Sequence, residues 1–127
     1  ITTIAAGAVD GSVFVDGFFA ESPVPHVVSF VNGFRDRYGA VPDLLAAQAY
    51  DTLTMCARVL RSGVRTRPEM RDGLAQISDF PGVSGVTSMD VNGDAEKVLY
   101  LLSVRGGRII QINAPAFRYP DAGDPAD

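Results

Sequence analysis

The sequence predicts a single-domain α/β protein that is part of something larger. One short strand-like segment comes first, three segments with helical spacing of apolar residues follow, and strand-like segments joined by glycine turns come last. A chain of 127 residues fits one domain. Three substantial helices on so few strands nevertheless leave a sheet whose remaining strands are not found in the sequence. We therefore expect the chain to be one piece of a longer protein.

The first element is a strand expected between Gly11 and Phe19. Its sequence, GSVFVDGFF, is short, rich in Val and Phe and flanked by glycine, which predicts a buried strand. The sequence AESPVP then ends it, because proline and serine favour turns.

The next element is an amphipathic helix expected over 24–38. Gly39 follows it as a C-terminal stop, and charged residues occupy the face opposite the apolar one. The apolar residues at helical spacing are Val27, Phe30, Val31, Phe34 and Tyr38.

A second helix is expected over 43–62, with Asp43 as its N-cap. Its apolar residues cover a wide arc, so we expect deep burial against a sheet. They are Leu45, Ala49, Leu53, Cys56, Val59 and Leu60.

A third helix is expected over 66–77, where Thr66 and Glu69 form a capping box and Pro68 occupies the first turn. After it, 83–89 predicts a short strand. Two further strands, 97–104 and 108–112, are separated by an Arg-Gly-Gly turn. The tail, 113–127, is rich in Pro and Asp and is expected to lie on the surface or to be disordered.

The acidic stretch around Gly93 raises the question of a metal loop. A calcium loop of the EF-hand type needs glycine at its sixth position and a bidentate Glu at its twelfth. Counting from Asp90, these positions hold Ala95 and Leu101. Asn92 and Gly93 between extended segments instead predict a hairpin with a type I′ turn. We expect no metal site and no cofactor.

Composition limits the function further. The net charge of −4 argues against a nucleic-acid surface, and no apolar run approaches the roughly 20 residues that span a bilayer. His26 is the only histidine and Cys56 the only cysteine. We interpret His26 as a partly exposed residue at a helix start and Cys56 as a small core residue, so no acid/base or thiol mechanism is supported and the protein is not expected to be an enzyme.

A few residues could line a polar cleft. Phe18 and Phe19 could stack on a ligand and Glu21 could hydrogen-bond to it, although burial in the core is the simpler interpretation for the two Phe. Asp51 lies beside Tyr50 on a mostly apolar helix, where a solvated or cap-like position and a position facing a cleft both remain open.

Several segments, taken in order, resemble the C-terminal part of the branched-chain amino-acid binding proteins, the Leu/Ile/Val type of class I periplasmic binding protein that serves ABC transporters. The resemblance runs from about Val9 to Ile112. Its motifs are the Tyr-Gly-x-x-Pro of 38–42, the Tyr-Asp pair of 50–51, the Phe-x-Gly-x-x-Gly of 80–85 and the Asp-x-Asn-Gly-Asp of 90–94.

The resemblance implies a fold of two lobes, each a Rossmann-like parallel sheet covered by helices, that close on an amino acid by hinge bending. It divides the chain into a hinge strand region (1–23), the helical part of one lobe (24–80), a hinge segment with hairpin strands (81–112) and the tail (113–127). The strand at 13–19 and the segment at 86–90 would cross between the lobes.

The same resemblance implies the partners and the candidate contacts. An ABC permease and a periplasmic or extracellular location are expected, with Phe18, Phe19 and Glu21 as candidate ligand contacts and Tyr50 and Asp51 as motif residues of mainly structural role. Family members are usually more than twice as long, and the groups that hold the ligand carboxylate and ammonium lie in the missing part. The alternatives are a sensory domain of the same fold and an interaction module that has lost its cleft.

Sheet edges and an uncovered helix face would recruit partners, so we also expect the isolated chain to associate with itself.

Overall fold

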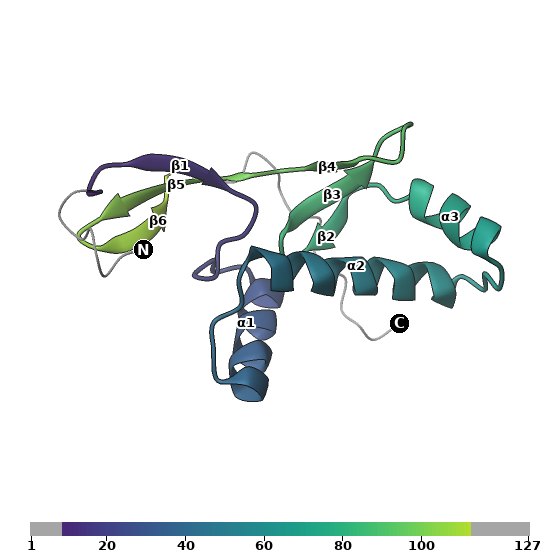
Figure 1. Ribbon diagram of the computed structural model, residues 1–127, viewed down its shortest axis with the longest axis horizontal. Coiled ribbons are helices and arrows are strands. Elements are labelled where there is room, and N and C mark those ends of the chain that lie inside the picture. The colour runs from purple at the N-terminus through teal and green to yellow at the C-terminus, as the bar shows by residue number, and fades with distance from the viewer. Residues whose placement is uncertain (1–8, 113–127) are drawn as a thin grey trace.

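The computed structural model describes residues 9–112, which form three helices and two separate three-stranded sheets (Figure 1). The strand order is β1-β5-β6 in one sheet and β2-β3-β4 in the other, and the helices lie with the second sheet. The elements are β1 (Val13–Asp16), α1 (Pro25–Tyr38), α2 (Leu44–Arg61), α3 (Arg67–Ala75), β2 (Phe80–Gly82), β3 (Gly85–Met89), β4 (Ala95–Lys97), β5 (Tyr100–Arg105) and β6 (Arg108–Gln111). The predicted tail, 113–127, lies outside the described residues.

The ends of the helices confirm the three that the sequence predicts. Gly39 ends α1 in the left-handed conformation, with φ of 68°, which costs glycine little. The Asp43 carboxylate accepts the Ala46 N–H at 2.8 Å and begins α2. Thr66 and Glu69 form the predicted capping box of α3, although this helix ends at Ala75, two residues earlier than expected.

The expectation that the wide apolar arc of α2 is deeply buried against a sheet is wrong for most of that arc. One face is buried, through Ala47, Asp51, Met55 and Val59. The opposite apolar face is open, with Leu45 73%, Leu53 71% and Leu60 52% exposed. The reason is that the described strands supply packing partners for only one side of the helix, so the apolar residues beyond that side have nothing to pack on.

The expectation of a buried first strand is also wrong in part. Among residues 9–112, β1 is an edge strand that pairs only with β5, and its Val13 and Val15 are 57% and 58% exposed. The burial falls instead on Phe18 and Phe19, which follow the strand. An edge strand that is covered on one face alone exposes alternate side chains.

Both glycine turns form hairpins, but with different geometry. Gly93 has φ of 85° while Asn92 does not have a positive φ, so the predicted type I′ turn is wrong there. The Asp90 carboxylate accepts the N–H groups of Asn92 and Asp94 and stabilises a longer turn instead. Gly106 and Gly107, with φ of 57° and 75°, make the second turn, which fits type I′.

Two segments connect the two sheets. The first crossing, 17–24, leads from β1 to α1, and the second crossing, Val98 and Leu99, joins β4 to β5, so that the predicted strand 97–104 is divided (Figure 1). The segment 86–90, expected to cross between lobes, is mostly inside β3 and pairs with β2 and β4. All strand pairs among residues 9–112 are antiparallel, so the parallel sheet expected for whole lobes is not formed within this part.

The buried side chains form three clusters. The first joins Phe18 to α1, α2 and the loop after β2, and contains Phe18, Val27, Val31, Ala47 and Val83. The second lies between α2, α3 and β2 and contains Met55, Val59, Ile77 and Phe80. The third belongs to the β1-β5-β6 sheet and contains Phe19, Tyr100 and Leu102. Each sheet therefore has its own core.

Candidate functional site

The most strongly polar buried group is Asp51, in the middle of α2 and 2% exposed. Its Oδ1 accepts the N–H of Val83 at 2.7 Å, and its Oδ2 accepts the N–H of Ser84 at 2.8 Å and the Ser84 hydroxyl at 2.5 Å. Hydrogen bonds to an ionised carboxylate are short and strong, and three of them offset the cost of burying it. The solvated position considered for Asp51 is therefore wrong.

Lys97, at the end of β4, completes this buried group. Its Nζ donates to Ser84 Oγ at 2.7 Å and to Thr87 Oγ1 at 2.8 Å, and it lies 4.0 Å from Asp51 Oδ2. The Lys97 side chain is 17% exposed, and burial lowers its pKa below the usual 10.5, while the Asp51 carboxylate acts in the opposite direction. We call Asp51, Ser84, Thr87 and Lys97 the polar cluster.

Two glycines let the loop lie close to its neighbours, Gly82 to Asp51 and Gly85 to Val98. A Cβ on Gly82 would lie 2.5 Å from Asp51 Oδ2 and 2.8 Å from the Gly85 carbonyl oxygen, and a Cβ on Gly85 would lie 2.7 Å from the Val98 carbonyl oxygen. Gly85 also has φ of 96°. The Phe-x-Gly-x-x-Gly spacing of 80–85 is thus the part of the sequence that accommodates the carboxylate.

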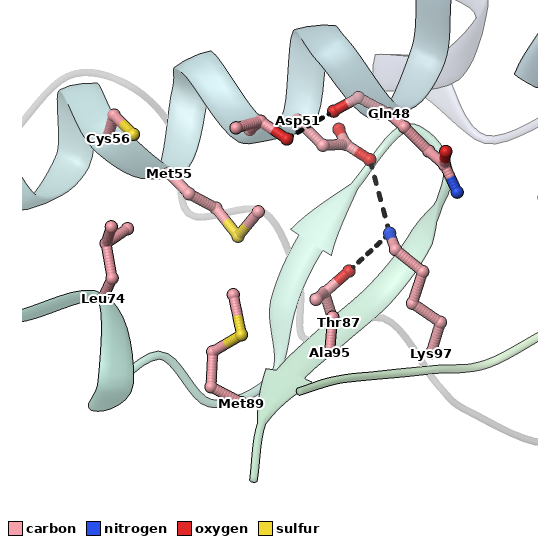
Figure 2. Close-up of a pocket in the computed structure, with 10 residues that line it drawn as sticks. Gln48, Asp51, Met55, Cys56, Leu74, Thr87, Met89, Ala95 and Lys97 are labelled. Carbon is pink, nitrogen blue, oxygen red and sulfur yellow. Dashed lines mark hydrogen bonds and ion pairs between the residues drawn. The ribbon is translucent and has the colours of Figure 1, made fainter. Parts of the chain in front are cut away.

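A cavity of about 300 Å³ opens beside the polar cluster, between α2, α3 and the β3-β4 hairpin (Figure 2). Lys97 and Thr87 lie at one end of it, and Met55, Leu74 and Met89 form an apolar wall at the other (Figure 2). The polar groups at this end are hydrogen-bonded to one another, so the cavity presents mainly apolar surface.

The structure separates the predicted ligand contacts. Phe18 is 6% exposed and packs edge-on against Phe30 with ring centroids 6.0 Å apart, whereas Phe19 is 8% exposed and lies 6.2 Å from the Tyr100 ring in the other core. Glu21 is exposed. Tyr50 is 48% exposed and packs against Phe30 with the ring centroids 4.8 Å apart and the rings tilted by 42°. The five predicted residues therefore do not converge on one cavity within 9–112, and their contact with a ligand stays a prediction.

Sequence reasoning missed Ser84, Thr87 and Lys97. The signal that could have found Ser84 is its place inside the Gly-x-x-Gly segment, where a helix carboxylate needs donors. Thr87 and Lys97 carry no such signal, because their contacts depend on the pairing of β3 with β4.

The remaining candidates have ordinary environments. His26 lies in the first turn of α1, partly buried, with Nε2 3.3 Å from the Gly82 carbonyl oxygen, and Cys56 is half-buried at the cavity wall. Among residues 9–112 no cluster of three or more His, Cys, Asp or Glu side chains could bind a metal ion. None of the helices in this part is both long and apolar enough to span a membrane.

Comparison with solved structures places the chain among solute-binding proteins. A candidate branched-chain amino acid ABC transporter from Rhodospirillum rubrum is 38% identical with a TM-score of 0.76, over 84% of this chain and 32% of that one. A branched-chain amino acid substrate-binding protein from Streptococcus pneumoniae in complex with isoleucine is 31% identical with a TM-score of 0.65, over 76% and 28%. A substrate-binding protein from Desulfitobacterium hafniense in complex with Leu is 27% identical with a TM-score of 0.70, over 82% and 32%.

The chain thus spans roughly one third of the length of these structures. Comparison with curated proteins gives no match. The sequence profile of the family described as "Periplasmic binding protein" matches residues 1–108. The chain therefore belongs to the periplasmic binding protein family.

Proposed function

We propose that the protein containing this chain is the extracytoplasmic solute-binding component of an ABC importer for branched-chain or related amino acids, and that it acts without catalysis. The observation that carries the proposal is the similarity to solute-binding proteins of that class, 38% identical in one case and solved with isoleucine or Leu in two others. The partners it implies are an amino acid and an ABC permease, and the location is periplasmic or extracellular.

The two crossings support a hinge mechanism. Each of the two sheets has its own core, and within residues 9–112 only the first and second crossings join them (Figure 1). A ligand that contacts both sides shifts the population toward the closed form. Phe18, Phe19 and Glu21, in the first crossing, remain our candidates for contact with the ligand, while Tyr50 and Asp51 serve structural roles.

The test uses the protein encoded by the complete reading frame that contains this chain. Calorimetry and thermal unfolding with leucine, isoleucine and valine, against glutamate as a control, are expected to show saturable binding and a raised Tm for the branched-chain ligands. A ligand at 100 times its Kd adds about 2.7 kcal/mol to the free energy of unfolding. If none of the three apolar amino acids binds, the proposal is wrong.

A sensory protein of the same fold would bind the same amino acids. Measuring uptake of the ligand by cells therefore distinguishes a sensory role from a transport role. Deleting the gene should abolish uptake of the labelled ligand if the protein serves an importer. If uptake persists while a ligand-dependent response is lost, the sensory alternative replaces the transport one.

We also propose that the isolated chain associates with itself through the open face of α2. This face carries Leu45, Leu53 and Leu60, all more than half exposed. Apolar surface of this kind, together with β1 and β6 as the edge strands of their sheet among residues 9–112, favours association with a second copy.

A further inference from the structure

Contacts from the first crossing, and from the second crossing together with the adjacent end of β4, converge on one loop, Gly82 to Gly85. In the first crossing, Phe18 packs in the same cluster as Val83, while the neighbouring Phe19 packs with Tyr100 on the other side. Directly before the second crossing, Lys97 at the end of β4 donates to Ser84. The first crossing thus shares a core with Val83, and the strand that leads into the second crossing is bonded to the next residue, Ser84.

The backbone of the second crossing also lies against Gly85, the last residue of the loop, and is bonded to the adjacent Val86 of β3. The Val98 N–H donates to the Val86 carbonyl oxygen at 3.2 Å, and a Cβ on Gly85 would lie 2.7 Å from the Val98 carbonyl oxygen. Any displacement of the loop therefore moves Val98 as well. Two backbones packed this closely respond together.

Asp51 is the group that holds the loop in place. It accepts the N–H of Val83, which fastens the first crossing, and both the N–H and the hydroxyl of Ser84, which fastens the second. The Asp51 side chain is 2% exposed, so these bonds do not compete with bulk water. α2, a helix of 18 residues, provides a rigid support for the carboxylate.

We propose that Asp51 is a positioning residue for the relative movement of the two sheets, and that it sets the balance between open and closed forms without touching the ligand. This inference rests on the proposed function, because the movement matters only if the protein closes on a solute. Removing the bonds from Asp51 to the loop should increase the mobility of both crossings. Removing the bond from Lys97 to Ser84 should increase the mobility of the second crossing alone.

The first test is made on the 127-residue chain by hydrogen exchange and needs no ligand. In Asp51→Asn the protection of the Phe18, Ser22 and Val98 amides is expected to fall at least about tenfold. In Lys97→Met only the Val98 amide should lose protection. The Phe18 amide is bonded to Asp16 Oδ1, the Ser22 amide to the Phe19 carbonyl oxygen and the Val98 amide to Val86, so each reports its own crossing.

The matched control is Asp43→Ala, which removes a carboxylate from the same helix but only from its N-cap. It should raise exchange in the first turn of α2 and leave both crossings protected. If Asp51→Asn does not fold, Ser84→Ala provides the same comparison, since it keeps the backbone bonds and removes one bond to Asp51 and one to Lys97. The proposal is overturned if the amides of the two crossings exchange as slowly in the Asp51 or Ser84 variant as they do in the Asp43→Ala control.

The second test is made on the protein from the complete reading frame, with leucine as the probe. Asp51→Asn should change the leucine Kd at least about threefold and reduce the compaction on binding seen by small-angle scattering, while Asp43→Ala should change neither. If the wild type fails to bind leucine, isoleucine or valine, the proposed function fails, and the exchange data still decide whether Asp51 fastens both crossings. If the wild type binds and the Asp51 variant matches it in Kd and compaction, the inference alone fails.

Discussion

The Asp51 carboxylate and Ser84 are joined by two hydrogen bonds, of 2.8 and 2.5 Å, although 33 residues separate them in the sequence. This contact ties the middle of a helix to the turn of a β-hairpin. Both residues are buried, and the contact explains why a helix of mostly apolar sequence carries a central acid.

Replacing Asp51 by alanine is expected to lower the free energy of unfolding by about 3 kcal/mol or more, because three charge-assisted bonds are lost and two buried N–H groups are left unpaired. Urea unfolding followed by circular dichroism measures the change. Asp72→Ala is the control, since Asp72 is 64% exposed in its side chain and pairs only with Arg71. It should change stability by less than about 0.5 kcal/mol, and a similar loss in both variants would contradict the prediction.

Replacing Gly82 by alanine should lower the free energy of unfolding, whereas replacing Gly33 by alanine should raise it. A Cβ on Gly82 would lie 2.5 Å from Asp51 Oδ2, so Gly82→Ala is expected to destabilise the protein by about 2 kcal/mol. Gly33 lies inside α1 with nothing within 4 Å of its Cβ position, so Gly33→Ala should stabilise by about 0.5–1 kcal/mol. Thermal unfolding of the two variants should move in opposite directions.

Lys97 is the only lysine in the sequence, so its titration can be followed by NMR as a single side-chain signal. Burial lowers the pKa of Lys97 below 10.5, and the Asp51 carboxylate partly counteracts this. Asp51→Asn should therefore lower the Lys97 pKa further. An unchanged or higher pKa in this variant would show that the two groups are not coupled.

The same shift predicts a pH dependence of stability. The folded chain binds the Lys97 proton more weakly than the unfolded chain does, so the unfolding free energy should rise as the pH increases from the lowered folded pKa toward 10.5. Lys97→Met should lack this rise. Urea unfolding at neutral and alkaline pH measures the effect: the unfolding free energy of the wild type should increase with pH relative to that of Lys97→Met.

The capping box of α3 predicts that the first turn of this helix becomes less stable at low pH. Hydrogen bonds from the backbone of Arg65 and then Thr66 lower the pKa of Glu69 below 4.5. Its support for the helix is therefore complete above about pH 4.5 and is lost as the pH falls through the lowered pKa. Glu69→Gln should remove this acid dependence, as measured by amide exchange in the first turn of α3, and should leave α1 unchanged.

Self-association through the open face of α2 is tested by Leu53→Lys. Leu53 is 71% exposed on the apolar face, and a charge there should shift the isolated chain toward monomer in light scattering after size exclusion. Val91→Lys is the matched control, because Val91 is fully exposed at the tip of the β3-β4 hairpin, far from that face in sequence. If both variants change the mass equally, or the wild type is monomeric at high concentration, the face is not the interface.

The sequence by itself determined the local features of this protein. The three helices, their caps at Asp43, Thr66 and Gly39, and both glycine hairpins follow from bonds between residues a few positions apart, which a local pattern encodes directly. The resemblance of ordered motifs over 9–112 was sufficient to indicate the family.

Only the tertiary structure decided how these elements use their side chains. The sequence of α2 shows a wide apolar arc but not which side finds a partner, so Leu53 is exposed and Asp51 is buried. Phe18 and Phe19 are neighbours in the chain, yet they enter different cores because the backbone passes from one sheet to the other between them. Lys97 reaches Ser84 and Asp51 only through the pairing of β3 with β4, and such long-range contacts are set by the packing of the whole chain, which no local spacing specifies.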